Sequence, residues 1–126
     1  MGRLETRKIK VTGAGSAGSA TGSAVETVPP CYFIGVYVDF TSAPSTTDTT
    51  IKALANSDVG EQTIVVLTNN NTDGWQYPRR QVEDNAGAAV TGAYDKFFVP
   101  GAVEVSIAQG DAVTDEVIAY VVIEVP

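Results

Sequence analysis

The chain of 126 residues contains no histidine and only one cysteine, Cys31, and these two absences exclude much catalytic and metal chemistry. Histidine is the commonest general base and transition-metal ligand, so neither a Ser-His-Asp triad nor a Cys-His pair can form. One cysteine supplies neither a zinc site of about four Cys or His ligands nor an internal disulfide. Cys31 begins the apolar run CYFIGV, where we expect a buried thiol acting as a small apolar side chain.

The chain also lacks a long apolar run and an excess of positive charge. No stretch approaches the roughly 20 residues that cross a bilayer, and the basic start MGRLETRKIK has no apolar segment of a secretion signal. Carboxylates outnumber basic groups by 15 to 8, and the formal net charge is −7. Because phosphate contacts require clustered positive side chains, we expect neither nucleic acid nor a membrane as a partner.

Paired carboxylates and glycine-rich loops offer little further chemistry. The neighbours Glu83 and Asp84, like Asp115 and Glu116, would point to opposite faces of a strand, whereas carboxylate catalysis needs two acids at a set separation. GAGSAG, residues 13–18, matches GxGxxG, but it lies in low-complexity sequence and no crossover helix follows it. We therefore predict no enzymatic activity, no catalytic residue, no cofactor and no bound metal.

Positive charge is concentrated at the start of the chain, which reads as a strand up to residue 12. The basic residues there are Arg3, Arg7, Lys8 and Lys10. The following GAGSAGSATGSA, residues 13–24, is typical of a flexible linker because it has little side chain to bury. The pattern divides the chain into an N-terminal arm or strand (1–12), a linker (13–24) and a body (25–126). Alternatively, the first strand packs on the body and 13–24 is a loose crossover.

The body alternates apolar and polar residues with the period of a β-strand. The even positions from Tyr32 to Phe40 are apolar and are predicted to face the core. No window shows the helical spacing of apolar residues between caps, so we predict a single all-β domain, a β-sandwich or jelly roll. The last strand has two apolar faces, which predicts a central position. The clearest strands are residues 31–40, 63–69, 102–110 and 115–126.

The stretch LTNNNTDGWQYPRR, residues 67–80, has the most unusual composition. Its asparagines and Asp-Gly pair are turn-forming, and their oxygens could bind Ca²⁺, although they follow no EF-hand pattern. Turn chemistry does not explain the residues that follow, in which Trp, Tyr and Arg, the types that dominate protein interfaces, come together. These candidate interface residues are Trp75, Tyr77, Arg79 and Arg80. Alternatively, Trp75 covers one end of the core and the arginines compensate the negative charge of the body.

A family resemblance rests on three features: the run LTNNNTDGWQYPR, the later VEVSIAQGDA, and a basic strand followed by a Gly/Ser/Ala run. Together they resemble small virion structural proteins of tailed bacteriophages, and most of all head decoration (cement) proteins. The resemblance implies a β-rich homotrimer on the capsid surface of the virion, assembled in the host cytoplasm. It also implies the major capsid protein as partner, contacted by an N-terminal arm that carries Arg3, Arg7, Lys8 and Lys10.

A second function stays open from the residues themselves. Tryptophan and planar polar groups form platforms for sugars. A carbohydrate-binding β-sandwich, also conceivable on a virion, would use Trp75, Tyr77 and the asparagines Asn69–Asn71 to bind a glycan.

Overall fold

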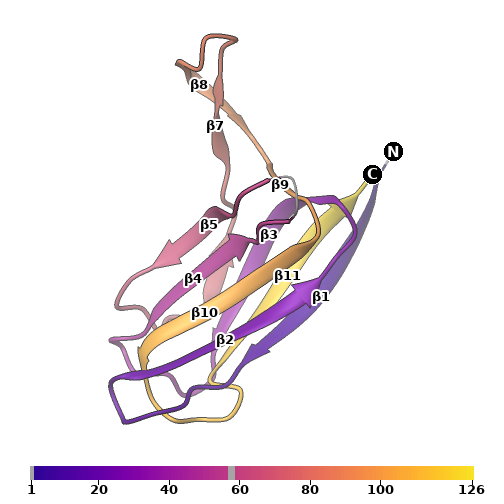
Figure 1. Ribbon diagram of the computed structural model, residues 1–126. Helices are drawn as coiled ribbons and strands as arrows, with labels where there is room; N and C mark the ends of the chain where they lie inside the picture. The colour runs from indigo at the N-terminus through magenta and orange to yellow at the C-terminus, as the bar shows by residue number, and fades with distance from the viewer. Residues whose placement is uncertain (1, 57–58) are drawn as a thin grey trace.

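The computed structural model describes residues 2–56 and 59–126, and all the regular elements in these ranges are β-strands (Figure 1). The prediction of an all-β chain is confirmed. The strands are β1 (Arg3–Val11), β2 (Ala20–Thr27), β3 (Cys31–Phe40), β4 (Asp48–Ala53), β5 (Gln62–Leu67), β6 (Gly74–Gln76), β7 (Arg80–Glu83), β8 (Ala89–Asp95), β9 (Phe97–Val99), β10 (Ala102–Gly110) and β11 (Val117–Val125).

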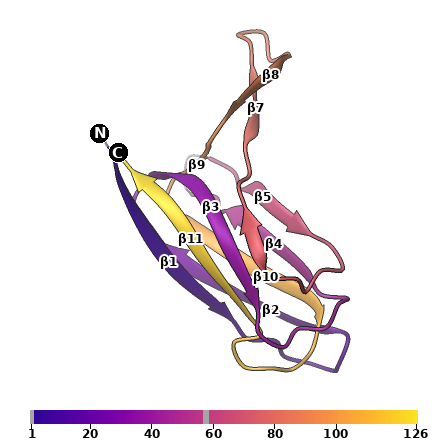
Figure 2. The ribbon, with the colours of Figure 1, turned by 180° about the vertical axis from the view of Figure 1, so that it is seen from behind.

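Two larger antiparallel sheets lie one over the other, and a small third sheet stands apart (Figures 1 and 2). The five-stranded sheet has the order β1-β11-β3-β6, and β9 also pairs with β3. The four-stranded sheet has the order β2-β10-β4-β5. The hairpin of β7 and β8 pairs only within itself and projects from one end of the body (Figure 1).

The strand pairings join opposite ends of the chain. β1 pairs with β11, β2 with β10, β3 with β6, and β4 with β5, and every pairing is antiparallel. When these eight strands are counted in chain order, the first pairs with the eighth, the second with the seventh, and so on inward. This is the pattern of one long antiparallel ribbon rolled up into two layers, so most pairings join residues that are distant in sequence.

One core lies between the two larger sheets, and period-two alternation explains most of it. Val103, Val105 and Ile107 of β10 are buried as predicted, and so is Cys31 at the start of β3. β11 lies between β1 and β3, which confirms its central position. Other large, fully buried side chains come from both sheets: Val11, Phe33, Val36, Val38, Ile51, Val99, Val117, Val121 and Ile123.

β3 departs from the predicted alternation part-way along its length. Phe33 and Val36 are both buried, whereas Tyr32 is exposed and Ile34 is only half-buried. The register with β11 shifts at Ile34, where one extra residue forms a β-bulge. One added residue reverses which side each following residue faces. The prediction that Tyr32 and Ile34 face the core together with Val36 is therefore wrong.

The N-terminal segment is an edge strand of the body, as in the alternative interpretation. β1 pairs with β11 over its whole length and buries Ile9 and Val11. The expectation of a flexible linker over 13–24 is wrong for residues 20–24, because they begin β2. At Gly22 a Cβ atom would collide with the carbonyl oxygen of Thr12, so small residues permit close backbone packing here.

Candidate functional site

The outer faces of the two larger sheets differ sharply in composition. Among the described residues, the outer face of the four-stranded sheet carries no aromatic side chain; it has polar and charged residues such as Thr50 and Glu104 and the exposed valines Val25 and Val66. The outer face of the five-stranded sheet and its edge carries six aromatic residues, whereas Phe33, Phe97 and Phe40 lie in the core. We call this surface the aromatic face. Its residues are Tyr32, Tyr37, Trp75, Tyr77, Phe98 and Tyr120.

A row of cross-strand neighbours runs over this face from β1 to β6: Lys8, Tyr120, Tyr37 and Trp75. The Lys8 Nζ lies 5.6 Å from the centre of the Tyr120 ring. The Tyr37 ring is 6.4 Å from that of Tyr120 and meets Trp75 edge to face at 5.5 Å. Trp75 stacks on Tyr77, with ring centres 5.7 Å apart and an interplanar angle of 9°. Each such contact contributes about 0.5–1.5 kcal/mol, so the rings hold one another in place.

A second cluster lies on the same face, towards the hairpin. Tyr32 and Phe98 meet edge to face with ring centres 5.7 Å apart. The Lys96 Nζ lies 5.5 Å from the centre of the Tyr32 ring and 2.9 Å from the Glu124 carboxylate. The two clusters therefore combine rings with cations that are already in contact with them.

Trp75 does not cover the end of the core. Its side chain is 49% exposed and that of Tyr77 is 61% exposed. The physical reason is the register of β6, which places Trp75 opposite Tyr37 on the outward side of the sheet. The interpretation of Trp75 as a core residue is therefore wrong, and a large apolar surface is left accessible on a rigid strand.

The two arginines after Tyr77 do not join the row of rings. Arg79 donates a hydrogen bond from Nη1 to the backbone carbonyl oxygen of Ile34 at 2.9 Å, and it thereby ties the chain to the bulge in β3. Arg80 begins β7 and lies across the hairpin from Asp95. Arg80 lines a small cavity with Tyr32, Lys96 and Phe98, so it lies beside the second aromatic cluster and not in the row that contains Trp75.

The basic residues of β1 also divide between two places. Lys8 and Lys10 are exposed, and Lys8 belongs to the aromatic face. Arg7 instead bridges the two sheets, with Nη1 3.0 Å from the Glu26 carboxylate of β2 and Nη2 3.0 Å from Glu5. Hydrogen bonds from Arg7 and then Arg3 lower the pKa of Glu5. Arg7 therefore ties β1 to β2, whereas Arg3 pairs with Glu5 of its own strand and stays largely exposed.

The asparagine-rich loop uses its side chains for bonds within the protein. The Asp73 Oδ1 accepts a hydrogen bond from the Phe40 N–H at 2.8 Å, and the Asn71 Nδ2 donates to the Ala43 carbonyl oxygen at 3.0 Å. These bonds fix the loop that leads into Trp75. Across the described part of the chain, no group of three or more Asp, Glu or Cys residues is placed to hold a metal ion.

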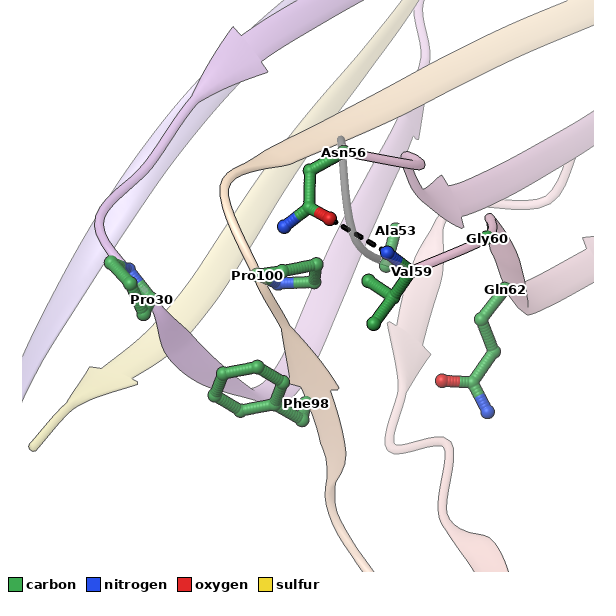
Figure 3. Close-up of a pocket in the computed structure, with 8 residues that line it drawn as sticks. All are labelled: Pro30, Ala53, Asn56, Val59, Gly60, Gln62, Phe98 and Pro100. Atoms are coloured by element: carbon green, nitrogen blue, oxygen red, sulfur yellow. Dashed lines mark hydrogen bonds between the residues drawn. The ribbon is translucent and has the colours of Figure 1, made fainter.

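A cavity of about 480 Å³ lies beside the base of the hairpin (Figure 3). Its lining residues are Pro30, Ala53, Asn56, Val59, Gly60, Gln62, Phe98 and Pro100. None of these lining side chains is ionisable, and the Asn56 Oδ1 accepts a hydrogen bond from the Val59 N–H at 2.9 Å (Figure 3). Phe98 connects the cavity to the aromatic face. The cavity is thus suited to hold an apolar group and offers no acid–base pair for catalysis.

Comparison with known proteins identifies no family for this chain. No protein-family model and no curated protein sequence matches the chain. Within residues 2–56 and 59–126, no helix is long and apolar enough to cross a membrane.

Sequence analysis named Trp75, Tyr77 and Lys8 but missed Tyr37 and Tyr120, which complete the row.

The buried thiol gives a direct chemical test of the core. Burial raises the pKa of Cys31 to about 11, so only about one thiol in a thousand is ionised at pH 8. We expect iodoacetamide to leave Cys31 unmodified at that pH in the folded protein and to label it fully in denaturant, as measured by mass spectrometry.

The same pKa shift fixes the sign of its effect on stability. The pKa of Cys31 is higher in the folded than in the unfolded state, so the stabilisation is present below about pH 8.5 and is lost as the pH rises towards 11. Labelling of the native protein at the rate of a free thiol would contradict this account of the β3 start.

Proposed function

We propose that the protein is a non-catalytic decoration protein that binds the outside of assembled tailed-phage heads and stabilises them. The observation that carries this proposal is the aromatic face, because Trp and Tyr side chains gathered on an exposed rigid sheet are the residues that anchor protein interfaces. The partner is the major capsid protein, and the site of action is the capsid surface of the virion.

The rings of the aromatic face restrict one another's motion, which favours a contact with a protein. Rings that already pack on one another lose little conformational freedom when a partner covers them, so more of the contact energy appears as affinity. A protein that binds the assembled lattice, and not the loose subunits, stabilises the lattice by mass action. This function requires no reaction, which agrees with the absence of histidine.

The pairing of the eight main strands supports the jelly roll, which is the more specific architecture that the sequence suggested within the all-β class. A ribbon rolled up so that the first strand pairs with the last gives this double-layered β-sandwich. Jelly rolls occur in both viral capsid and lectin domains, so the fold agrees with either candidate and decides between neither. We further propose that the protein acts as a homotrimer, as the family resemblance implies.

Carbohydrate binding is the second candidate, because Trp75 and Tyr77 are exposed and face outward. Sugars stack on a free ring face. The two rings stack on each other instead, which occupies one face of each, and Tyr37 approaches Trp75 edge to face. This mutual packing favours a protein partner over a glycan.

The experiment that tests the proposal is co-sedimentation with undecorated heads assembled from the major capsid protein of the same phage. We expect Trp75→Ala to weaken binding at least about tenfold, since an aromatic anchor contributes about 2 kcal/mol or more. Trp75→Ala also loses the ring contacts with Tyr37 and Tyr77, which together contribute about 1–3 kcal/mol, so binding is compared at a temperature where the variant remains folded. Val66→Ala, on the outer face of the four-stranded sheet, is the matched control and should bind normally.

Two outcomes would overturn the assignment. Equal binding of the Trp75 and Val66 variants to heads would remove the aromatic face as the contact surface. The other outcome is that the unaltered protein binds a glycan on an array, that Trp75→Ala loses this binding, and that neither protein binds heads. This result would establish carbohydrate binding as the function.

A further inference from the structure

The cavity beside the base of the hairpin is lined by both larger sheets (Figure 3). Ala53 of β4 and Gln62 of β5 come from the four-stranded sheet, and Phe98 of β9 comes from the five-stranded sheet. Ala53 also belongs to the buried core, so the cavity borders that core. Protein interiors are closely packed, whereas ligand sites measure roughly 300–1,000 Å³. A space of about 480 Å³ at this position is therefore large enough for a group from outside the chain.

The lining of this cavity selects against charge. Pro30, Val59, Phe98 and Pro100 contribute apolar surface, and none of the lining side chains is ionisable. A charged group would lose its hydration in this cavity without gaining an opposite charge, which is unfavourable. The cavity is therefore suited to an uncharged apolar group, such as an aromatic or branched aliphatic side chain.

Gln62 adds a polar group that matches a peptide. Within the described chain, its side-chain amide makes no hydrogen bond. The amide offers two N–H donors and a carbonyl acceptor, so it can pair with the C=O and N–H groups of a peptide backbone. An apolar side chain that enters the cavity on a peptide brings these backbone groups with it, whereas a free hydrocarbon does not. Gln62 therefore favours a protein as the source of the apolar group.

The cavity is continuous with the aromatic face. The neighbouring cavity of about 310 Å³ shares Gln62 and Phe98 with it and is also lined by Tyr32 and Lys96. Tyr32, Phe98 and Lys96 form the second cluster of the aromatic face. A protein that covers this cluster therefore lies directly beside the apolar cavity.

We propose that the cavity receives one apolar side chain, aromatic or branched aliphatic, from the protein that covers the aromatic face. The inference rests on the proposed function and extends it, because it assigns an anchor to the capsid protein. Anchors of protein interfaces fill pockets on the partner and lose their contact with water there. Trp75 is an anchor that this chain supplies, and the cavity is the pocket in which it accepts one.

Filling the cavity from within tests the inference. Gly60 lines the cavity, and a Cβ atom added there would meet nothing within 4 Å, so Gly60→Leu has room for its side chain in the cavity. We expect this variant to weaken co-sedimentation with undecorated heads at least about tenfold, because the partner's side chain is excluded. Gly60→Ala is the matched control, since it restricts the backbone similarly but leaves most of the cavity open. It should bind like the unaltered protein, and circular dichroism verifies that both variants are folded.

A small probe tests the cavity in the absence of capsids. N-acetyl-phenylalanine amide should shift the backbone amide NMR signals of Ala53 and Gln62 with a Kd on the order of millimolar. N-acetyl-lysine amide carries a charged side chain and should leave these signals in place. Gly60→Leu should lose the response to the phenylalanine probe, whereas Gly60→Ala and Trp75→Ala should keep it.

The outcomes separate this inference from the proposed function. Absence of the probe shifts, or equal head binding by Gly60→Leu and Gly60→Ala, overturns the inference, and head binding through the aromatic face is still judged by Trp75→Ala. If the probe binds but the unaltered protein does not bind heads, the proposed function fails. The capsid protein then fails with it as the source of the side chain.

Discussion

Phe33→Ala is expected to lower the free energy of unfolding by about 3–5 kcal/mol. The ring is fully buried, at 0% exposure, between the two larger sheets, and its removal leaves a cavity that the surrounding strands cannot close. Urea denaturation followed by tryptophan fluorescence and circular dichroism measures this loss.

Phe98→Ala is the matched control, because it removes the same atoms from a ring that is 47% exposed. There we expect a loss of about 1 kcal/mol or less, from the edge-to-face contact with Tyr32. Equal losses in the two variants would mean that Phe33 is not enclosed by both sheets.

Gly13→Ala is expected to lower the free energy of unfolding by at least about 2 kcal/mol, because it disturbs the loop around Glu116, at the end of the body away from the hairpin. A Cβ atom at this position would collide with the Glu116 carboxylate and the carbonyl oxygen of Asp111. Glu116 is itself fully buried and accepts a hydrogen bond from the Asp111 N–H at 2.7 Å. Movement of the carboxylate away from the new methyl group would disturb that bond, and the Glu116 Oε2 already has no hydrogen-bond partner within the described residues, so a fully buried polar group would lose its hydrogen bond, which is unfavourable.

Thermal melting measures the effect of Gly13→Ala, and we expect a fall in Tm of roughly 6–10 °C for a domain of this size. Gly101→Ala is the control, since its added methyl group would meet no atom within 4 Å. A Tm within about 1 °C of the unaltered protein for both variants would contradict the close packing of the loop around Glu116.

Alternation in the sequence predicted a strand correctly where the same side of that strand faces the core along its length. β10 runs from Ala102 to Gly110, and the alternation is kept up to Ile107, where Glu104 and Ser106 face outward; beyond it the register with β2 shifts and Gln109 is exposed. The bulge at Ile34 was not readable, since it follows from the register with β11, which lies far along the chain. Local composition carries no information about such a register shift.

The Gly/Ser/Ala run was misread for a related reason. Small side chains occur both in mobile linkers, where nothing packs on them, and in strands that approach another backbone closely. Gly22 in β2 is of the second kind, and Gly13, in the loop after β1, is packed as closely, because a Cβ atom at either would meet neighbouring backbone. Sequence composition is the same in both cases, and the neighbouring chain decides between them.

The candidate site was half predictable. Trp75 and Tyr77 were found from composition, but Tyr37 and Tyr120 join them only through pairings between three strands. A usable indication was nevertheless present in β11, because Tyr120 lies between the buried Ala119 and Val121 and must face outward. An aromatic residue on the outward side of a core strand is the sign to look for.

The pairing of β1 with β11 has a consequence for how the protein is made. These strands lie more than about a hundred residues apart, yet they pair over their full length. During translation β1 emerges from the ribosome long before β11, and it waits without its partner until β11 has emerged. Folding of this sheet therefore cannot finish before β11 is available, and such long-range pairing is slow. The lysines of β1 protect that waiting strand from premature association.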